Sequence, residues 1–180
     1  MPLSTDKAAQ PRSGSILTWI VGKLVALCEL FPYAPIGLGM RLIMARDFFQ
    51  SGQGMIDGPV VPLWTFGGVP DISIVLPVYI KDATLQLFET QYAALPIPPA
   101  TTAYIFGYAE FALPICLAIG FATRFAALGL LVLTVLITVY VMPDAFWATH
   151  VYWVAILMVL MSVGPGAISL DAGIRYLYGR

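Results

Sequence analysis

The sequence predicts an all-α membrane protein, a four-transmembrane-helix bundle with an N-terminal interfacial helix and a short amphipathic helix in the first external loop. Of the 180 residues, 59% are hydrophobic and 11% are charged, whereas a soluble domain usually carries about 25% charged residues. Several apolar segments also approach the roughly 20 residues that a helix needs to cross the hydrocarbon core. A chain this short has room for one domain, and its polar surface cannot cover a water-facing globule.

The N-terminal part, residues 1–33, is predicted to be cytoplasmic and to contain an amphipathic helix over 16–30. That stretch has only about 15 residues and Lys23 interrupts it, which favours a position in the membrane interface over a span. The membrane domain follows over residues 34–171, and residues 172–180 form a cytoplasmic tail.

Three spans are indicated by length and apolar composition, over residues 101–121, 124–142 and 145–163. A fourth, residues 34–56, comes first in the chain and carries three charged side chains. Proline and glycine residues bracket it and the rest of it is apolar, so we expect it to span the membrane as well.

The longest connection, residues 57–99, is acidic and follows the first span. Within it we expect a short amphipathic helix over 83–95, because apolar side chains recur there at helical spacing, at Leu85, Phe88, Tyr92 and Leu95. Residues 60–80 are apolar but broken by prolines and glycines, and we expect them to lie against the membrane or to fold into the mouth of the bundle. Most lysines and arginines lie outside this loop, so the positive-inside rule places both termini in the cytoplasm.

Charged residues inside predicted spans are the main functional candidates, because each costs about 2.5–3.5 kcal/mol on insertion scales. They are Arg41, Arg46 and Asp47 in the first span and Glu110 in the second. Helical arithmetic places Arg46, Asp47 and Glu110 at similar depths and Arg41 within about two turns of them, so a pair between Glu110 and an arginine is geometrically easy. Such charges can neutralise one another and fix helix register. Alternatively, they can form a polar site for a proton or a quinone carbonyl, and both interpretations stay open.

Three further residues are secondary candidates. His150 is expected to be a hydrogen-bonding residue at the external interface, with a second polar site beside Asp144 as the alternative. Arg124 and Asp171 are expected at the cytoplasmic surface, either as a salt bridge or as a solvated pair worth at most about 1 kcal/mol. Residues 169–171 can cap a last helix.

Several classes of function find no support in the residues. Cys28 and Cys116 have no metal-ligand spacing, and one histidine cannot build a metal site. No glycine-rich loop indicates a nucleotide site. The net charge of −1 gives no footprint for nucleic acid. An electron carrier would therefore be a quinone or would belong to a partner.

Three motifs in order resemble the DoxX family of small bacterial membrane proteins. They are an arginine followed by phenylalanine and glycine (Arg41 to Gly52), a Glu–Gly–Thr–Arg pattern (Glu110 to Arg124) and a Gly-x-x-Ser-Leu-Asp ending at Asp171. The LFETQYAALPIPP stretch and Thr149-His150 look like the branch encoded beside small metal-handling peptide systems. Relatives often carry a lysine near the end of the first span, where this chain has Gln50 and Met55.

The resemblance implies a multi-pass four-helix bundle in the bacterial cytoplasmic (inner) membrane. Some relatives are subunits of thiosulfate:quinone oxidoreductase, and others are thought to join membrane redox complexes with soluble enzymes. The leading hypothesis is therefore an accessory subunit of a quinone-linked redox system, and any enzymatic role would be as part of such an oxidoreductase complex. The alternative is a non-enzymatic anchor or assembly partner, with a redox or metal-handling protein bound at loop 57–99. A transporter is less favoured, because neither paired discontinuous helices nor a repeat is evident.

Overall fold

The computed structural model describes residues 16–29, 32–66 and 69–178, and the chain divides into two units, which we describe separately. In the described part of the first unit, α1 (Ile16–Glu29) covers almost the whole stretch predicted as the interfacial helix. The Lys23 ammonium lies 5.9 Å from the centroid of the Trp19 ring, one helical turn away, in a cation–π contact.

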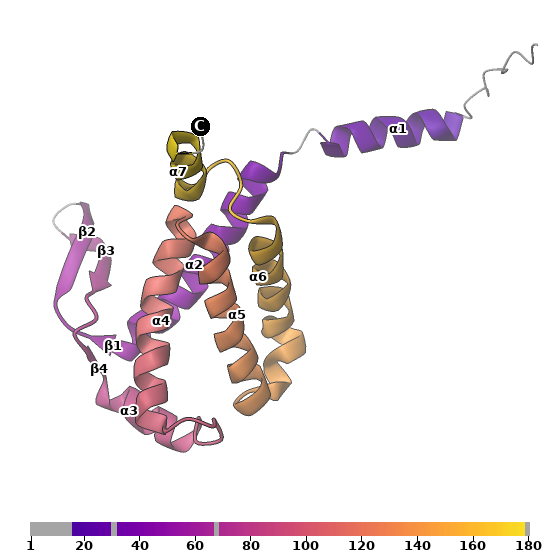
Figure 1. The fold of residues 1–180 in the computed structure, drawn as a ribbon. Helices are drawn as coiled ribbons and strands as arrows, with labels where there is room; N and C mark the ends of the chain where they lie inside the picture. Colours follow the sequence, from indigo (N-terminus) through magenta and orange to yellow (C-terminus); the bar gives the residue numbers. More distant parts are fainter. Residues whose placement is uncertain (1–15, 30–31, 67–68, 179–180) are drawn as a thin grey trace, which may run out of the picture. The chain divides into compact units, whose positions relative to one another are not determined.

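The second unit begins at Tyr33, and four helices form its core (Figure 1). They are α2 (Tyr33–Met55), α4 (Pro99–Ile119), α5 (Thr123–Tyr140) and α6 (Val151–Val163). Both α2 and α5 pack against α4 and α6, so the four helices close into a bundle. A 3-10 turn (Pro143–Ala145) and a π-helical turn (Phe146–His150) lead into α6. Large apolar side chains fill the interior, among them Met44, Phe48, Phe106, Leu117, Leu130 and Leu157.

In the described residues, three helical stretches are long and apolar enough to cross a membrane: Pro99–Ile119, Thr123–Tyr140 and Pro143–Val163. They agree with three of the predicted spans to within about two residues at each end. The fourth expected span is α2, whose 23 residues are sufficient in length but include three charged ones. The three spans establish a helical membrane protein.

The loop after α2 contains strands, which are not among the elements that we expected there from the sequence. Residues 60–80 contain an antiparallel hairpin of β2 (Val60–Phe66) and β3 (Val69–Val75), flanked by a short pair of β1 (Ile56–Asp57) and β4 (Tyr79–Ile80). Figure 1 shows the hairpin beside the bundle. β-Branched and aromatic residues on both sides of a Gly-Gly dipeptide favour such a hairpin. The prolines in β2 and β3 are tolerated because each strand of a two-stranded sheet has a free edge.

The end of this loop is fastened to the C-terminal end of α2. The Gln53 side-chain amide donates to the Val75 carbonyl at 3.1 Å, and its oxygen accepts the Val75 N–H at 2.7 Å. Lys81 Nζ donates to the Gly54 carbonyl at 3.0 Å, and Thr84 Oγ1 donates to that of Met55 at 3.1 Å. The last carbonyls of α2 are thus satisfied by the returning chain.

The short helix α3 (Asp82–Thr90) packs on α4. It begins one residue before the predicted helix and ends five residues earlier, and the chain continues as turns. The Phe88 ring lies 5.6 Å from that of Phe106, and the Tyr92 ring lies 6.2 Å from it, measured between centroids. Near the C-terminus, α7 spans Leu170–Tyr178. Ser169 precedes this helix and caps it as predicted, because its Oγ accepts the Ala172 N–H at 3.1 Å.

Candidate functional site

Glu110 lies inside the bundle, with 1% of its surface exposed, where α4 passes close to α2. The residue opposite it on α2 is Gly52. A Cβ atom added to Gly52 would lie 2.6 Å from the carbonyl carbon and oxygen of Glu110. The two backbones are therefore in contact, as small residues allow in membrane helix packing.

One oxygen of the Glu110 carboxyl has no partner. The Ser51 side chain lies within hydrogen-bonding reach of the carboxyl, but Oε2 is buried without a hydrogen bond in the described part of the chain. Tyr92, from the turn after α3, also lies near this carboxyl. Burial raises the pKa of the Tyr92 phenol, and the Glu110 charge raises it further. A buried acceptor without a partner is uncommon in folded proteins, and it marks Glu110 as a place where a ligand or water can bind.

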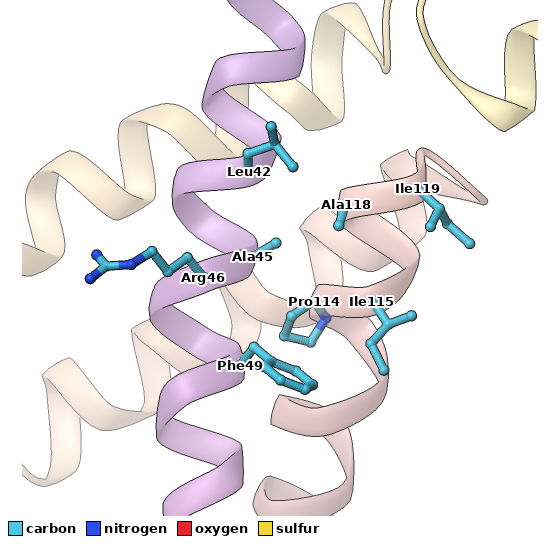
Figure 2. A pocket seen from close by; sticks show the side chains of 8 residues that line it. All are labelled: Leu42, Ala45, Arg46, Phe49, Pro114, Ile115, Ala118 and Ile119. Atoms are coloured by element: carbon cyan, nitrogen blue, oxygen red, sulfur yellow. The ribbon is translucent and has the colours of Figure 1, made fainter. Parts of the chain in front are cut away.

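An open apolar groove runs along α2 and α4 (Figure 2). Its volume is about 320 Å³, and it is lined by Leu42, Ala45, Arg46 and Phe49 of α2 and by Pro114, Ile115, Ala118 and Ile119 of α4. At the end nearer Glu110, the Phe49 ring meets that of Phe111, with 5.6 Å between centroids. The groove is therefore suited to an apolar chain, and its end lies about one helical turn from Glu110.

Arg46 and Asp47 interact with each other rather than with Glu110. Arg46 Nη1 lies 3.7 Å from Asp47 Oδ1, and 71% of the Arg46 side chain is exposed. Figure 2 shows the guanidinium pointing away from α4, so only the stem of Arg46 borders the groove. An exposed pair of neighbouring residues contributes little to stability.

Arg41 is completely buried at the opposite end of the α2–α4 contact. Its Nη2 donates to the Ile168 carbonyl, whereas Nε and Nη1 have no partner in the described chain. Its Nη1 lies against Gly120, where a Cβ would collide with it. Gly120 ends α4 with φ 73°, a left-handed conformation that favours glycine, so this glycine serves both the turn and the buried guanidinium.

The structure does not bring Arg41 and Glu110 together. Gly52 lies at the level of Glu110, and the 11 residues between Arg41 and Gly52 correspond to about 16 Å of helix. The pair that the sequence makes easy is therefore absent. The start of α2 extends about two helical turns past the end of α4. A depth counted from the end of each span assumes that these two ends are level, so it misses the offset.

Arg124 and Asp171 do not form the salt bridge that was one of the two alternatives for this pair. Asp171 Oδ1 and Oδ2 instead accept the backbone N–H groups of Ala122 and Thr123, at 2.8 and 3.0 Å. The carboxylate thus caps the N-terminus of α5, where the helix dipole favours negative charge. Arg124 donates a long 3.4 Å hydrogen bond to the Val163 carbonyl.

His150 is buried, with 6% of its surface exposed, and its ring makes a hydrogen bond. Its Nδ1 lies 2.7 Å from Thr138 Oγ1, which itself donates to the Thr134 carbonyl at 2.7 Å. Since the hydroxyl has one proton, Nδ1 must donate to it, so neutral His150 carries its proton on Nδ1. The π-helical turn brings the ring inside, and the predicted site with Asp144 does not form around it.

Sequence reasoning missed Ser51, Tyr92 and Thr138 as neighbours of the buried polar groups. Tyr92 was assigned to the apolar face of the loop helix, and no pattern indicates that this face reaches the mouth of the bundle beside Glu110. Gly52 carried a usable signal, since a glycine among apolar residues of a span often marks a close helix contact.

Fold and site together define a helical integral membrane protein with two separately buried charged residues. In the described residues, no group of three or more histidine, cysteine, aspartate or glutamate side chains could hold a metal ion. The DoxX family model matches residues 36–143, more than half of the chain. The protein therefore belongs to the DoxX family. No curated protein and no solved structure matches the chain.

Proposed function

We propose that this protein is an accessory subunit of a quinone-linked redox system in the bacterial cytoplasmic membrane, and that Glu110 meets the quinone head group. One observation carries the proposal: Glu110, whose Oε2 is buried without a partner in the described chain, lies about one helical turn from the end of an open apolar groove. A quinone has the matching parts, namely an apolar tail and a ring with two carbonyl oxygens. Membership of the DoxX family agrees with this role.

The carboxyl of Glu110 can act in either protonation state. As an acid it donates a hydrogen bond to a ring carbonyl, and as a carboxylate it accepts one from a ring hydroxyl. A quinone takes up two electrons and two protons when it is reduced. The electrons would come from an oxidoreductase partner. Glu110 would pass one proton to the ring oxygen that it contacts, and water would supply the second proton to the other ring oxygen and reprotonate Glu110.

The proposal includes a topology in which α2 is a fourth span. Its 23 residues correspond to about 34 Å of helix, and it packs beside α4 and α6 within the bundle. Residues 34–171 then form the membrane domain, and residues 1–33 and 172–180 lie in the cytoplasm. Membrane-impermeant thiol labelling of cysteines placed at residues 12 and 176 tests this orientation, since labelling from the outside at either position contradicts it.

The quinone site is tested by mass spectrometry of the lipids that the gently purified protein retains. Glu110→Leu removes both carboxyl oxygens at similar volume, and Glu89→Leu is the control because Glu89 is an exposed residue of α3. Glu110→Leu also removes the carboxyl that Ser51 reaches, but Ser51 is exposed, and thermal unfolding of each variant shows whether it is folded. We expect quinone retention to fall by about two- to tenfold in Glu110→Leu, the value of one hydrogen bond, and to stay unchanged in the control.

The groove is tested in the same assay. Ala118→Leu fills the groove, whereas Ala112→Leu adds the same volume on an exposed position of α4 that does not line it. Only the first should lower quinone retention. Equal retention by all four variants, or no enrichment of quinone over the bulk membrane in the wild type, overturns the proposal.

A second function is favoured by the hairpin of β2 and β3, that of a non-enzymatic anchor or assembly partner for a redox, metal-handling or stress-handling protein. Val60 and Leu63 are 61% and 59% exposed, and both strands have a free edge. Exposed apolar strands of this kind pair readily with another chain. Deleting residues 60–75 should abolish crosslinks to a partner in intact membranes, and unchanged crosslinks contradict this function.

A further inference from the structure

A second pocket lies at the end of the bundle opposite the hairpin attachment, between the start of α5 and α7. Its volume is about 300 Å³. Arg124 and Arg175 contribute its cationic side chains, and Phe125 and Pro165 are among its apolar ones. It shares no lining residue with the groove near Glu110, so the two pockets are separate.

The guanidinium groups of both arginines in this pocket have N–H groups that make no hydrogen bond in the described chain. Arg124 makes the 3.4 Å hydrogen bond to the Val163 carbonyl, and Arg175 Nε makes one of 3.3 Å to the Asp171 carbonyl. In the described chain, neither guanidinium has a carboxylate within ion-pair distance. Each therefore keeps most of its five N–H groups for another acceptor.

The charge of the pocket is positive although Asp171 lines it. Both oxygens of that carboxylate are held by backbone N–H groups of α5. Its negative charge also lies close enough to interact with the buried Arg41. Three arginines thus face one aspartate in this region, and the aspartate is already used as a cap.

A further polar group lines the pocket without a partner. Thr123 is fully buried, and its Oγ1 makes no hydrogen bond within the described residues. Two guanidinium groups and a hydroxyl around one cavity match the oxygens of a phosphate group. An acceptor with several oxygens would satisfy all three at once.

The position of the pocket favours a phosphate that belongs to a lipid. Arg124 and Phe125 are in the first turn of a membrane-spanning helix, and Phe125 is 77% exposed. Tyr176 and Leu177 of α7 are 74% and 72% exposed, as expected for an amphipathic helix at the membrane surface. A head group in the pocket would have its acyl chains beside Phe125.

From this geometry we infer that the pocket between α5 and α7 binds the phosphate of an anionic phospholipid through Arg124 and Arg175. This site is independent of the proposed quinone function. Because it lies at one end of the bundle, a bound lipid would hold α7 against the start of α5.

The inference is tested by thermal unfolding of the purified full-length protein in detergent, with added phosphatidylglycerol, phosphatidylcholine or inorganic phosphate. We expect phosphatidylglycerol alone to raise the midpoint of wild-type unfolding. Arg124→Gln and Arg175→Gln should each weaken its apparent affinity by about tenfold or more. Arg124→Lys should also weaken it, since lysine keeps the charge but loses the planar fork.

Lys23→Gln is the matched control, because it removes one exposed cation that is not among the residues lining the pocket, and it should leave the affinity unchanged. Unfolding without lipid shows whether each variant is folded. An equal effect of phosphatidylcholine, or equal affinities of Arg124→Gln and Lys23→Gln, overturns the site. An equal stabilisation by inorganic phosphate assigns the pocket to a free anion and overturns the lipid as its ligand.

Discussion

Gly52→Ala directly tests the close contact between α2 and α4. An added Cβ atom would lie 2.6 Å from two backbone atoms of Glu110 and 2.9 Å from the Phe111 nitrogen, and ordinary contact begins at 3.4 Å. The helices must therefore separate by about 0.8 Å, because backbone atoms cannot rotate away as a side chain can. Overpacking of this kind costs about 1–3 kcal/mol.

The matched control is Gly39→Ala in the same helix, where an added Cβ meets nothing within 4 Å. Both substitutions gain about 0.5–1 kcal/mol of helix propensity, so the difference between them isolates the overpacking. Thermal unfolding in detergent, followed by circular dichroism, should place the midpoint of Gly52→Ala several degrees below that of Gly39→Ala. Equal midpoints would refute the close approach of α2 to α4.

Three other predictions concern polar groups. Asp171→Ala should destabilise the protein by about 1–2 kcal/mol in thermal unfolding because α5 loses its cap, and an unchanged midpoint contradicts this. The raised pKa of Tyr92 stabilises the fold below the ordinary value of 10.0, and this contribution is lost as the pH rises through the higher folded-state pKa. Unfolding midpoints followed from neutral pH to above pH 10 should therefore fall more steeply in the wild type than in Tyr92→Phe, and parallel curves argue against the shift. Thr138→Val should lower the free energy of unfolding by about 1–3 kcal/mol, because it leaves the His150 Nδ1–H unpaired. The control is Thr134→Val, which removes only a hydrogen bond within α5. Equal losses of stability in thermal unfolding contradict the assigned proton position.

The spans could be predicted because their determinants are local. The composition of an apolar run of about 20 residues shows where a span begins and ends, and the sequence predicts the three spans to within about two residues at each end. The cap at Ser169 is local too, since a serine hydroxyl reaches a backbone N–H only three residues ahead.

The contacts of the charged residues could not be predicted, because they depend on the offset between helices. Arg41 and Arg46 are five positions apart, which places them about 140° apart around α2. Only packing decides which one is buried, and in the structure Arg41 is inside and Arg46 outside. Similarly, Asp171 caps α5 from 48 residues away, a distance over which spacing says nothing.

The separation of Arg41 and Glu110 bears on why both are present. If Arg41 and Glu110 formed an ion pair, the pair would neutralise both charges and fix the register of α2 against α4, and no further role would be needed. That explanation requires the two side chains to be in contact. Here each residue is at its own glycine contact, Arg41 at Gly120 and Glu110 at Gly52. Arg41 has a structural role, because it holds the Ile168 carbonyl and so the chain that leads into α7. Glu110 holds no such segment. Both residues keep buried polar atoms without a partner in the described chain, namely Nε and Nη1 of Arg41 and Oε2 of Glu110. A buried acceptor costs about 1–3 kcal/mol when it is left unsatisfied, and this is the cost that the proposed quinone head group would offset at Glu110.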